Sequence, residues 1–271
     1  MYNVRVPRSR QARERPDGDS LWLLGSVPPR TSAPRRASRK DTPLTRDAIV
    51  TAAIGIADLE GADAVTMRRV ARDLDASPMA LYWHVDNKED LLALMLDAVE
   101  GEIEIPPPTG EWRADVTKTA RRYRRGLLRH GWMTNLIGVR RSLGPNELPH
   151  IERSLAAFDG LDLAVRDAFN ILMAIETYYL GFALREQQEL AAERAVEDTT
   201  PAQRRAFFKN AGRQLADTGD YPRLATLFEE GTLPSRDERF ELGLARLLDG
   251  IEANLPDSRK ATRRRSTRKA T

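Results

Sequence analysis

The chain of 271 residues has no cysteine, only three histidines, and few aromatic residues, at 6% of the sequence. The lack of cysteine excludes disulfides and thiolate metal sites and fits a reducing compartment, so we expect a cytoplasmic protein. The histidines form no local cluster with metal-ligand spacing, so we expect neither a metal nor a cofactor. No apolar run approaches the roughly 20 residues of a membrane-spanning helix, and no apolar segment follows the N-terminal arginines as in a signal peptide.

Charge is unevenly distributed, although the whole chain carries only +3. Residues 1–41 contain ten basic and four acidic residues, and residues 256–271 contain seven basic residues and one acidic residue. The part of the chain between them is therefore net acidic. Both ends are polar and lack any periodic apolar pattern. We predict that 1–41 and 256–271 are disordered basic tails, able to bind nucleic acid without sequence preference.

Between the tails almost every segment shows the helical period and none shows sustained strand alternation, which predicts an all-α fold. The run Pro106-Pro107-Pro108 interrupts this pattern and separates a domain at 42–104 from a larger one at 109–255. Helix-capping residues mark the expected starts of four helices in the first domain, at Thr45, Thr66, Ser77 and Asn87. In the second domain the pattern predicts helices at 112–129, 147–158, 163–190, 201–215 and 237–253.

The second and third of these helices, at 66–73 and 77–84, have the length and separation of a helix-turn-helix unit. The tight turn between them contains Asp75, a residue type that tolerates the left-handed backbone such a turn needs. In a helix-turn-helix the first helix crosses the phosphate backbone and the second enters the major groove. The spacing therefore predicts a DNA-binding head.

Three neighbouring residues at the end of the second helix, Tyr82, Trp83 and His84, support this interpretation. Consecutive helical residues point about 100° apart, so the three cannot all face one core. At least part of the cluster must face solvent or a partner, and we expect its polar groups to reach phosphates. A buried core trio is the alternative, and the one-residue spacing argues against it.

Other residues of the same unit have side chains suited to DNA. Pro78, Met79 and Ala80 stand at the helix tip, where they can contact thymine methyl groups. Arg68 can donate to guanine O6 and N7, and Lys88 can pair with phosphate at the start of the next helix. The candidate DNA-binding residues are Arg68, Ser77, Pro78, Met79, Ala80, Tyr82, Trp83, His84 and Lys88.

The stretch "VTMRRVARDLDASPMALYWHVDNKEDLLALML" resembles the DNA-binding domain of TetR-family transcriptional regulators. The stretches "GEWRADVTKTARRYRRGLLRHG", "LGFALREQQEL" and "FELGLARLLDGIEANL" are similar to the tetracycline-repressor type of C-terminal domain. The resemblance implies three small N-terminal helices, a connecting fourth helix, and a larger helical domain for ligand binding and dimerisation. It further implies a homodimer that represses from a palindromic operator until a small molecule changes the spacing of its two heads.

Two features depart from that family. Residues 42–92 hold five basic and nine acidic residues, so DNA affinity would depend on the N-terminal arm. Tetracycline repressors also chelate drug-bound magnesium through a histidine, whereas the matching stretch here, "MTNLIGVRRSLG", contains none. Arg185 stands where a later carboxylate is expected. These departures argue against tetracycline as the ligand.

The second domain offers candidate ligand contacts, all of apolar type except one carboxylate. Glu176 lies on an apolar helix face and either orients a ligand or pairs with an arginine across the dimer. For each apolar candidate, ordinary core packing is an equally good interpretation. His130 is expected to be a hydrogen-bonded core residue and His150 a surface residue. The candidate ligand-binding residues are Trp132, Met133, Leu136, Phe158, Met173 and Glu176.

The helices at 163–190 and 237–253 are the expected dimer faces, which would form a four-helix interface. In the second of these helices a helical seam with a close-approach glycine faces the partner. The seam consists of Phe240, Gly243, Leu244, Leu247, Leu248 and Ile251.

Two other functions are weighed. Gly18-Asp19-Ser20-Leu21 spells the GDSL signature of a hydrolase family, but it follows no strand and no Asp-x-x-His occurs later in the chain. A short match of this kind is common by chance, so we assign no catalytic residue and no enzyme activity. The other alternative is a DNA-architectural protein that binds through its basic tails without sequence preference.

Overall fold

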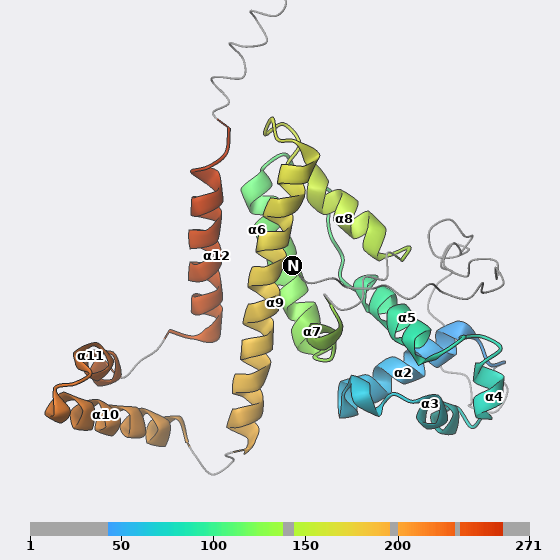
Figure 1. Cartoon of the computed structure of the whole chain (residues 1–271), viewed down its shortest axis with the longest axis horizontal. Helices are drawn as coiled ribbons and strands as arrows, with labels where there is room; N and C mark the ends of the chain where they lie inside the picture. The colour runs from blue at the N-terminus through green and yellow to red at the C-terminus, as the bar shows by residue number, and fades with distance from the viewer. Residues whose placement is uncertain (1–42, 138–143, 196–199, 231–233, 257–271) are drawn as a thin grey trace, which may run out of the picture.

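The computed structural model describes residues 43–137, 144–195, 200–230 and 234–256 (Figure 1). Within these residues every regular element is helical, which confirms the predicted all-α fold class. The two predicted basic tails lie outside the described residues, apart from Pro256.

The N-terminal head consists of α2 (Arg46–Glu60), the 3-10 turn η1 (Ala62–Ala64), α3 (Met67–Asp73) and α4 (Pro78–Leu81). Each α-helix begins at a predicted cap, because the side-chain oxygens of Thr45, Thr66 and Ser77 accept the backbone N–H three residues further on, at 3.1–3.2 Å. These bonds satisfy donors that have no partner within the helix. The sequence therefore sets where all three helices start.

The turn between α3 and α4 has the predicted left-handed residue, Asp75, at φ 53°. Ala71 is almost fully buried, and its carbonyl accepts the N–H of Ala76 at 2.9 Å, which closes the turn. Val70 and Leu81 are fully buried with Ile49 and allow the two helices to pack on α2. This is the arrangement of a helix-turn-helix unit.

Two predicted helix ends in the N-terminal part of the chain differ from the structure. The helix expected to reach His84 ends at Leu81, because the N–H groups of His84 and Val85 both bond to the Leu81 carbonyl and tighten the chain. Helix α5 (Lys88–Glu100), capped by Asn87 as predicted, ends well before the proline run. Gly101 follows it, and glycine is a poor helix former, so the chain leaves the helix in successive turns there.

The larger domain is built on α9 (Val165–Ala195), the longest described helix. Figure 1 shows α6 (Trp112–Arg129) and α12 (Arg236–Glu252) beside it and α8 (Glu147–Ala156) near its N-terminal half. The short α7 (Met133–Leu136) follows α6 and contacts α9. Helices α10 (Pro201–Thr218) and α11 (Pro222–Glu230) pack on each other and project away from this bundle (Figure 1).

The expected dimer seam on α12 is wrong in part. Phe240, Leu244 and Leu248 are at most 1% exposed within a single chain, so they belong to its own core. Gly243 faces Tyr178 of α9, whose hydroxyl donates to the Phe240 carbonyl at 2.7 Å. The close approach that this glycine permits is therefore between α12 and α9 of one chain.

Candidate nucleic-acid interface and effector domain

Helix α4 and the turn that follows it present an exposed apolar and aromatic surface. Trp83 is 85% exposed, Met79 is 70% exposed and Tyr82 is 47% exposed. Leu81 and Val85, between and after them, are buried and anchor the segment to the head. A tryptophan held this far out of the core has no packing role in the chain, which is the arrangement expected of a recognition surface.

The other candidate DNA-binding residues lie on the neighbouring elements. Arg68 is exposed on α3, and Lys88 is half-buried at the first position of α5. The hydroxyl of Ser77 caps α4, and the carbonyl of His84 accepts from Arg46 Nε at 3.0 Å, which ties the end of this segment to α2. The candidates therefore lie on α3, on α4 and the residues that flank it, and at the start of α5, although Ser77 already has a structural role.

The candidate ligand-binding residues are buried or half-buried in the larger domain. Trp132, Met133 and Phe158 are nearly fully buried, and the Trp132 indole N–H donates to Asp58 of α2 at 2.7 Å. Phe158 packs against Trp112, with ring centroids 6.2 Å apart. The structure thus places these side chains in the core. Leu136, Met173 and Glu176 are half-buried.

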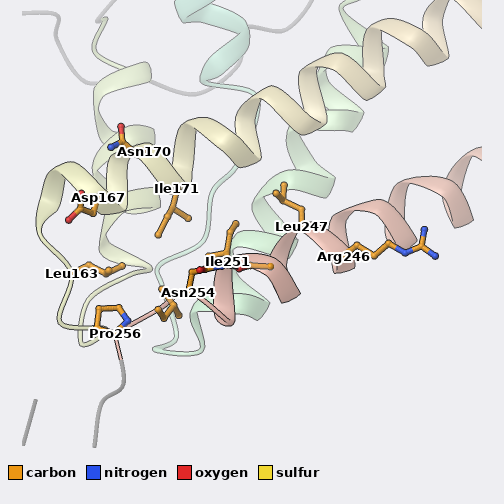
Figure 2. Close-up of a pocket in the computed structure, with 11 residues that line it drawn as sticks. Leu163, Asp167, Asn170, Ile171, Arg246, Leu247, Ile251, Asn254 and Pro256 are labelled. Carbon is orange, nitrogen blue, oxygen red and sulfur yellow. Dashed lines mark hydrogen bonds between the residues drawn. The ribbon is translucent and has the colours of Figure 1, made fainter. Parts of the chain in front are cut away.

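A groove of about 600 Å³ lies elsewhere, between the N-terminal part of α9 and the C-terminal part of α12. Figure 2 shows Leu163 and Ile171 on one side and Leu247 and Ile251 on the other, with Asp167, Asn170, Arg246 and Asn254 around them. None of the six candidate ligand residues lines this groove. Its apolar floor and polar surround are typical of a surface that packs against another chain.

A buried polar cluster joins α5, α6 and α8, and it corrects the expectation that His150 lies at the surface. The Tyr123 hydroxyl donates to Glu100 at 2.8 Å, and His150 Nδ1 lies 3.3 Å from the same carboxylate oxygen. All three residues are at most 8% exposed, and Tyr123 stacks on Tyr179 at 5.0 Å. Burial, together with the negative charge of Glu100, raises the pKa of Tyr123 well above its usual value, so its hydroxyl remains a donor.

Asp97, also on α5, caps the start of α8. Its carboxylate accepts the backbone N–H groups of Asn146 and Glu147 at 3.0 and 3.2 Å, and the Asn146 side chain donates to it at 2.8 Å. Neither Asp97 nor Glu100 was among the residues predicted from the sequence. An acidic residue among the buried apolar residues of a helix was the signal that could have identified both.

His130 is a buried, hydrogen-bonded histidine, as predicted. Its Nδ1 lies 2.8 Å from Asp58, and its Nε2 lies 3.3 Å from Glu102. In the part of the chain that the structure describes, no group of three or more potential ligands could hold a metal ion, and no helix is long and apolar enough to cross a membrane.

Comparison with known proteins assigns both domains. Residues 49–95 match the model of the bacterial regulatory proteins of the tetR family, and residues 106–255 match the tetracyclin repressor-like C-terminal domain. The transcriptional repressor DrrR1 of Streptomyces coeruleorubidus is 36% identical over 221 residues, covering 80% of this chain and 81% of the relative. The class E tetracycline repressor of Escherichia coli is 28% identical, covering 81% of this chain and 95% of the relative.

Solved structures agree with this assignment. ActR of Streptomyces coelicolor in complex with actinorhodin superposes with a TM-score of 0.66 at 32% identity, covering 80% of this chain and 100% of ActR. Its ligand-free form gives a TM-score of 0.65, also at 32% identity, covering 81% of this chain and 99% of ActR. The GDSL sequence lies outside the described residues, and these relatives give no support to a hydrolase or an architectural protein. The chain belongs to the TetR family of bacterial transcriptional regulators.

Proposed function

We propose that the chain is a cytoplasmic, homodimeric repressor that binds a palindromic operator through two copies of α4 and is released by a small molecule. The observation that carries the proposal is the exposed surface of Met79, Tyr82 and Trp83, on the second helix of a helix-turn-helix and in the turn directly after it. Membership of the TetR family supplies the repressor interpretation.

The head divides its DNA contacts by side-chain chemistry. Pro78, Met79 and Ala80 at the tip of α4 are suited to thymine methyl groups, and Arg68 is suited to guanine. Tyr82, Trp83 and His84 are proposed to contact phosphates, and Lys88 pairs with phosphate at the N-terminus of α5. Arg69 is already bonded to Glu60 at 2.8 Å, so we assign it no DNA contact.

The dimer is proposed to form through α9 and α12. The groove between them exposes Ile171 and Ile251 beside charged Asp167 and Arg246, and a second copy would cover it with the same surface. Four helices, two from each chain, would then make a self-complementary interface. This arrangement uses Leu247 and Ile251 of the predicted seam but leaves its buried residues in the core of each chain.

The effector is proposed to bind in the larger domain, near the six candidate residues. The effector releases the DNA only if it binds the dimer geometry that cannot bind DNA more strongly than it binds the DNA-competent geometry. Actinorhodin, with which ActR was crystallised, is the first compound to test, and tetracycline is the comparison. The absence of the chelating histidine predicts that tetracycline with magnesium will not release this protein.

The test is to capture genomic fragments with the full-length protein at near-physiological salt and to sequence them. An enriched palindrome supports the proposal, and the neighbouring genes then suggest the effector class. Enrichment without any motif would contradict sequence-specific repression and favour binding through the basic tails.

A further inference from the structure

A polar contact joins the DNA-binding head to the effector domain away from the connecting helix α5. Asp58, near the end of α2, has its Oδ1 atom 2.8 Å from Nδ1 of His130 and 2.7 Å from Nε1 of Trp132. The two donors come from the turn between α6 and α7. Their rings lie 6.1 Å apart and are tilted by 63°. We name this contact, formed by Asp58, His130 and Trp132, the head clamp.

In the head clamp, the chemistry of the carboxylate determines which groups donate and which group accepts. An ionised carboxylate only accepts hydrogen bonds, so His130 must donate from Nδ1. Both bonds are charge-assisted and lie at short distances, which makes them stronger than neutral pairs. The other edge of the imidazole, at Nε2, lies 3.3 Å from Glu102, and Arg129 lies 3.3 Å from the same carboxylate oxygen.

The turn that carries the donors is fixed to the body of the effector domain. Gln187 of α9 donates to the Leu127 carbonyl at 2.7 Å, and Thr134 bonds to Gln187 at 3.2 Å and to the Gly131 carbonyl at 2.8 Å. His130 and Trp132 are both buried, with 4% of each residue exposed. The donors therefore move with α9.

On the other side, Asp58 belongs to the helix on which the reading unit rests. Helices α3 and α5 contact α2, and Arg46 of α2 holds the carbonyl of His84 at the end of the recognition segment. A change in the angle of α2 would therefore change where Trp83 points. The head clamp therefore links α2 to the turn between α6 and α7, which is itself bonded to α9 through Gln187.

We propose that Asp58 is a positioning residue, which through His130 and Trp132 fixes the orientation of the reading head against the effector domain. The proposal rests on the proposed function and adds a physical route by which an effector-driven movement near α7 reaches α4. It also assigns Trp132, expected to be a pocket-wall residue, a polar role at the boundary between the domains.

The chain has no cysteine, so spin labels can be placed on two exposed positions with R72C on α3 and R166C on α9. Doubly labelled chains are mixed with excess unlabelled chain, so that each distance lies within one protomer whether or not the protein dimerises. We expect one narrow distance distribution for the intact clamp. D58A and W132F should give a broad distance distribution. D58N, which keeps an acceptor oxygen, should give a narrow one.

D63A is the matched control, because it removes another exposed carboxylate of the head and should leave the distribution narrow. Circular dichroism is used to check that each variant keeps its helices. W132F keeps an aromatic ring in the core, so it still provides a test if D58A fails to fold. A narrow distribution in both D58A and W132F would overturn the proposal.

A second measurement links the clamp to DNA reading. The ratio of affinities for the captured operator and for the same operator with a base pair inserted at its centre should fall in D58A and recover in D58N. An unchanged ratio in D58A contradicts a positioning role in DNA reading. If the wild-type protein binds no operator, the proposed function fails, while the distance distributions still decide whether the clamp fixes the head.

Discussion

Gly144 lies against a buried carboxylate, so even a small side chain at this position should destabilise the protein. A Cβ atom at this position would overlap the carboxylate of Asp97, which caps the start of α8. G144A should force Asp97 away from the N–H groups of Asn146 and Glu147, and it should lower the free energy of unfolding by about 3 kcal/mol. Denaturant unfolding followed by circular dichroism measures the change.

Gly55 provides the matched control for that substitution. It lies within α2, and a Cβ there would meet nothing within 4 Å. G55A should stabilise the protein by about 0.5–1 kcal/mol, because alanine loses less backbone entropy in a helix than glycine. Equal effects of the two substitutions would contradict the role assigned to Asp97.

Glu189 predicts a pH dependence of stability. The hydrogen bond from Arg239 lowers the pKa of Glu189 from its ordinary value of 4.5 to about 2, and Arg185 and Arg236 add to the effect. A lowered pKa in the folded state stabilises the protein above pH 4.5, and this contribution is lost as the pH falls towards 2.

E189Q should therefore cost about 1 kcal/mol of unfolding free energy at neutral pH, a modest figure because the pairs are partly exposed and screened. Urea unfolding at pH 7 and pH 3 tests this. The difference in unfolding free energy between wild type and variant should be smaller at pH 3. A gap that stays constant would show that the arginines do not lower the pKa of Glu189.

At the scale of elements, Trp83, two residues after the end of α4, tests the assignment of α4 and the turn that follows it as the recognition element. Because this side chain is 85% exposed, W83A should leave the melting temperature unchanged. It should weaken operator binding about tenfold, equal to about 1.4 kcal/mol. Fluorescence anisotropy with labelled operator measures the affinity.

Y221A removes an aromatic residue that is 53% exposed on the segment before α11, and it should leave DNA affinity unchanged. If both variants bind as the wild type does, the DNA-contacting role of α4 is wrong.

Helix starts were predictable because they depend on local chemistry: Thr45, Thr66, Ser77 and Asn87 all cap the helices assigned to them. Helix ends were less predictable from the sequence. The end of α5 is set by Gly101 and the turns after it, and the end of α4 by two N–H groups that share one carbonyl. Contacts between distant segments, such as that of Asp58 with Trp132, have no periodic signature in the sequence.

At the scale of the whole molecule, the described head is net acidic in sequence, so its affinity for DNA needs another source of positive charge. Residues 1–41 carry ten basic residues and four acidic residues. Deleting residues 1–40 should weaken binding to all DNA sequences alike and flatten the dependence of affinity on salt, because fewer counterions are released. A salt slope that does not change would refute a role for this arm in binding.

The sequence also limited what could be known of the effector. Trp132, Met133 and Phe158 have the apolar character of pocket walls and are nearly fully buried, a position that fits a pocket wall and ordinary core packing alike. An apolar residue satisfies either role, and only its neighbours in space distinguish them. His150 was expected at the surface but is buried, because its partners Glu100 and Tyr123 come from helices far away in the sequence.

The most direct test of the account is a titration of the full-length protein onto its captured palindrome, with sedimentation of the complex to count the chains. The comparison DNAs carry one or both half-sites scrambled. The account predicts two chains on each palindrome and an affinity at least about 10³-fold tighter than for the fully scrambled DNA. Equal affinity for all the DNAs, or binding as single chains, would contradict a dimeric, sequence-specific repressor.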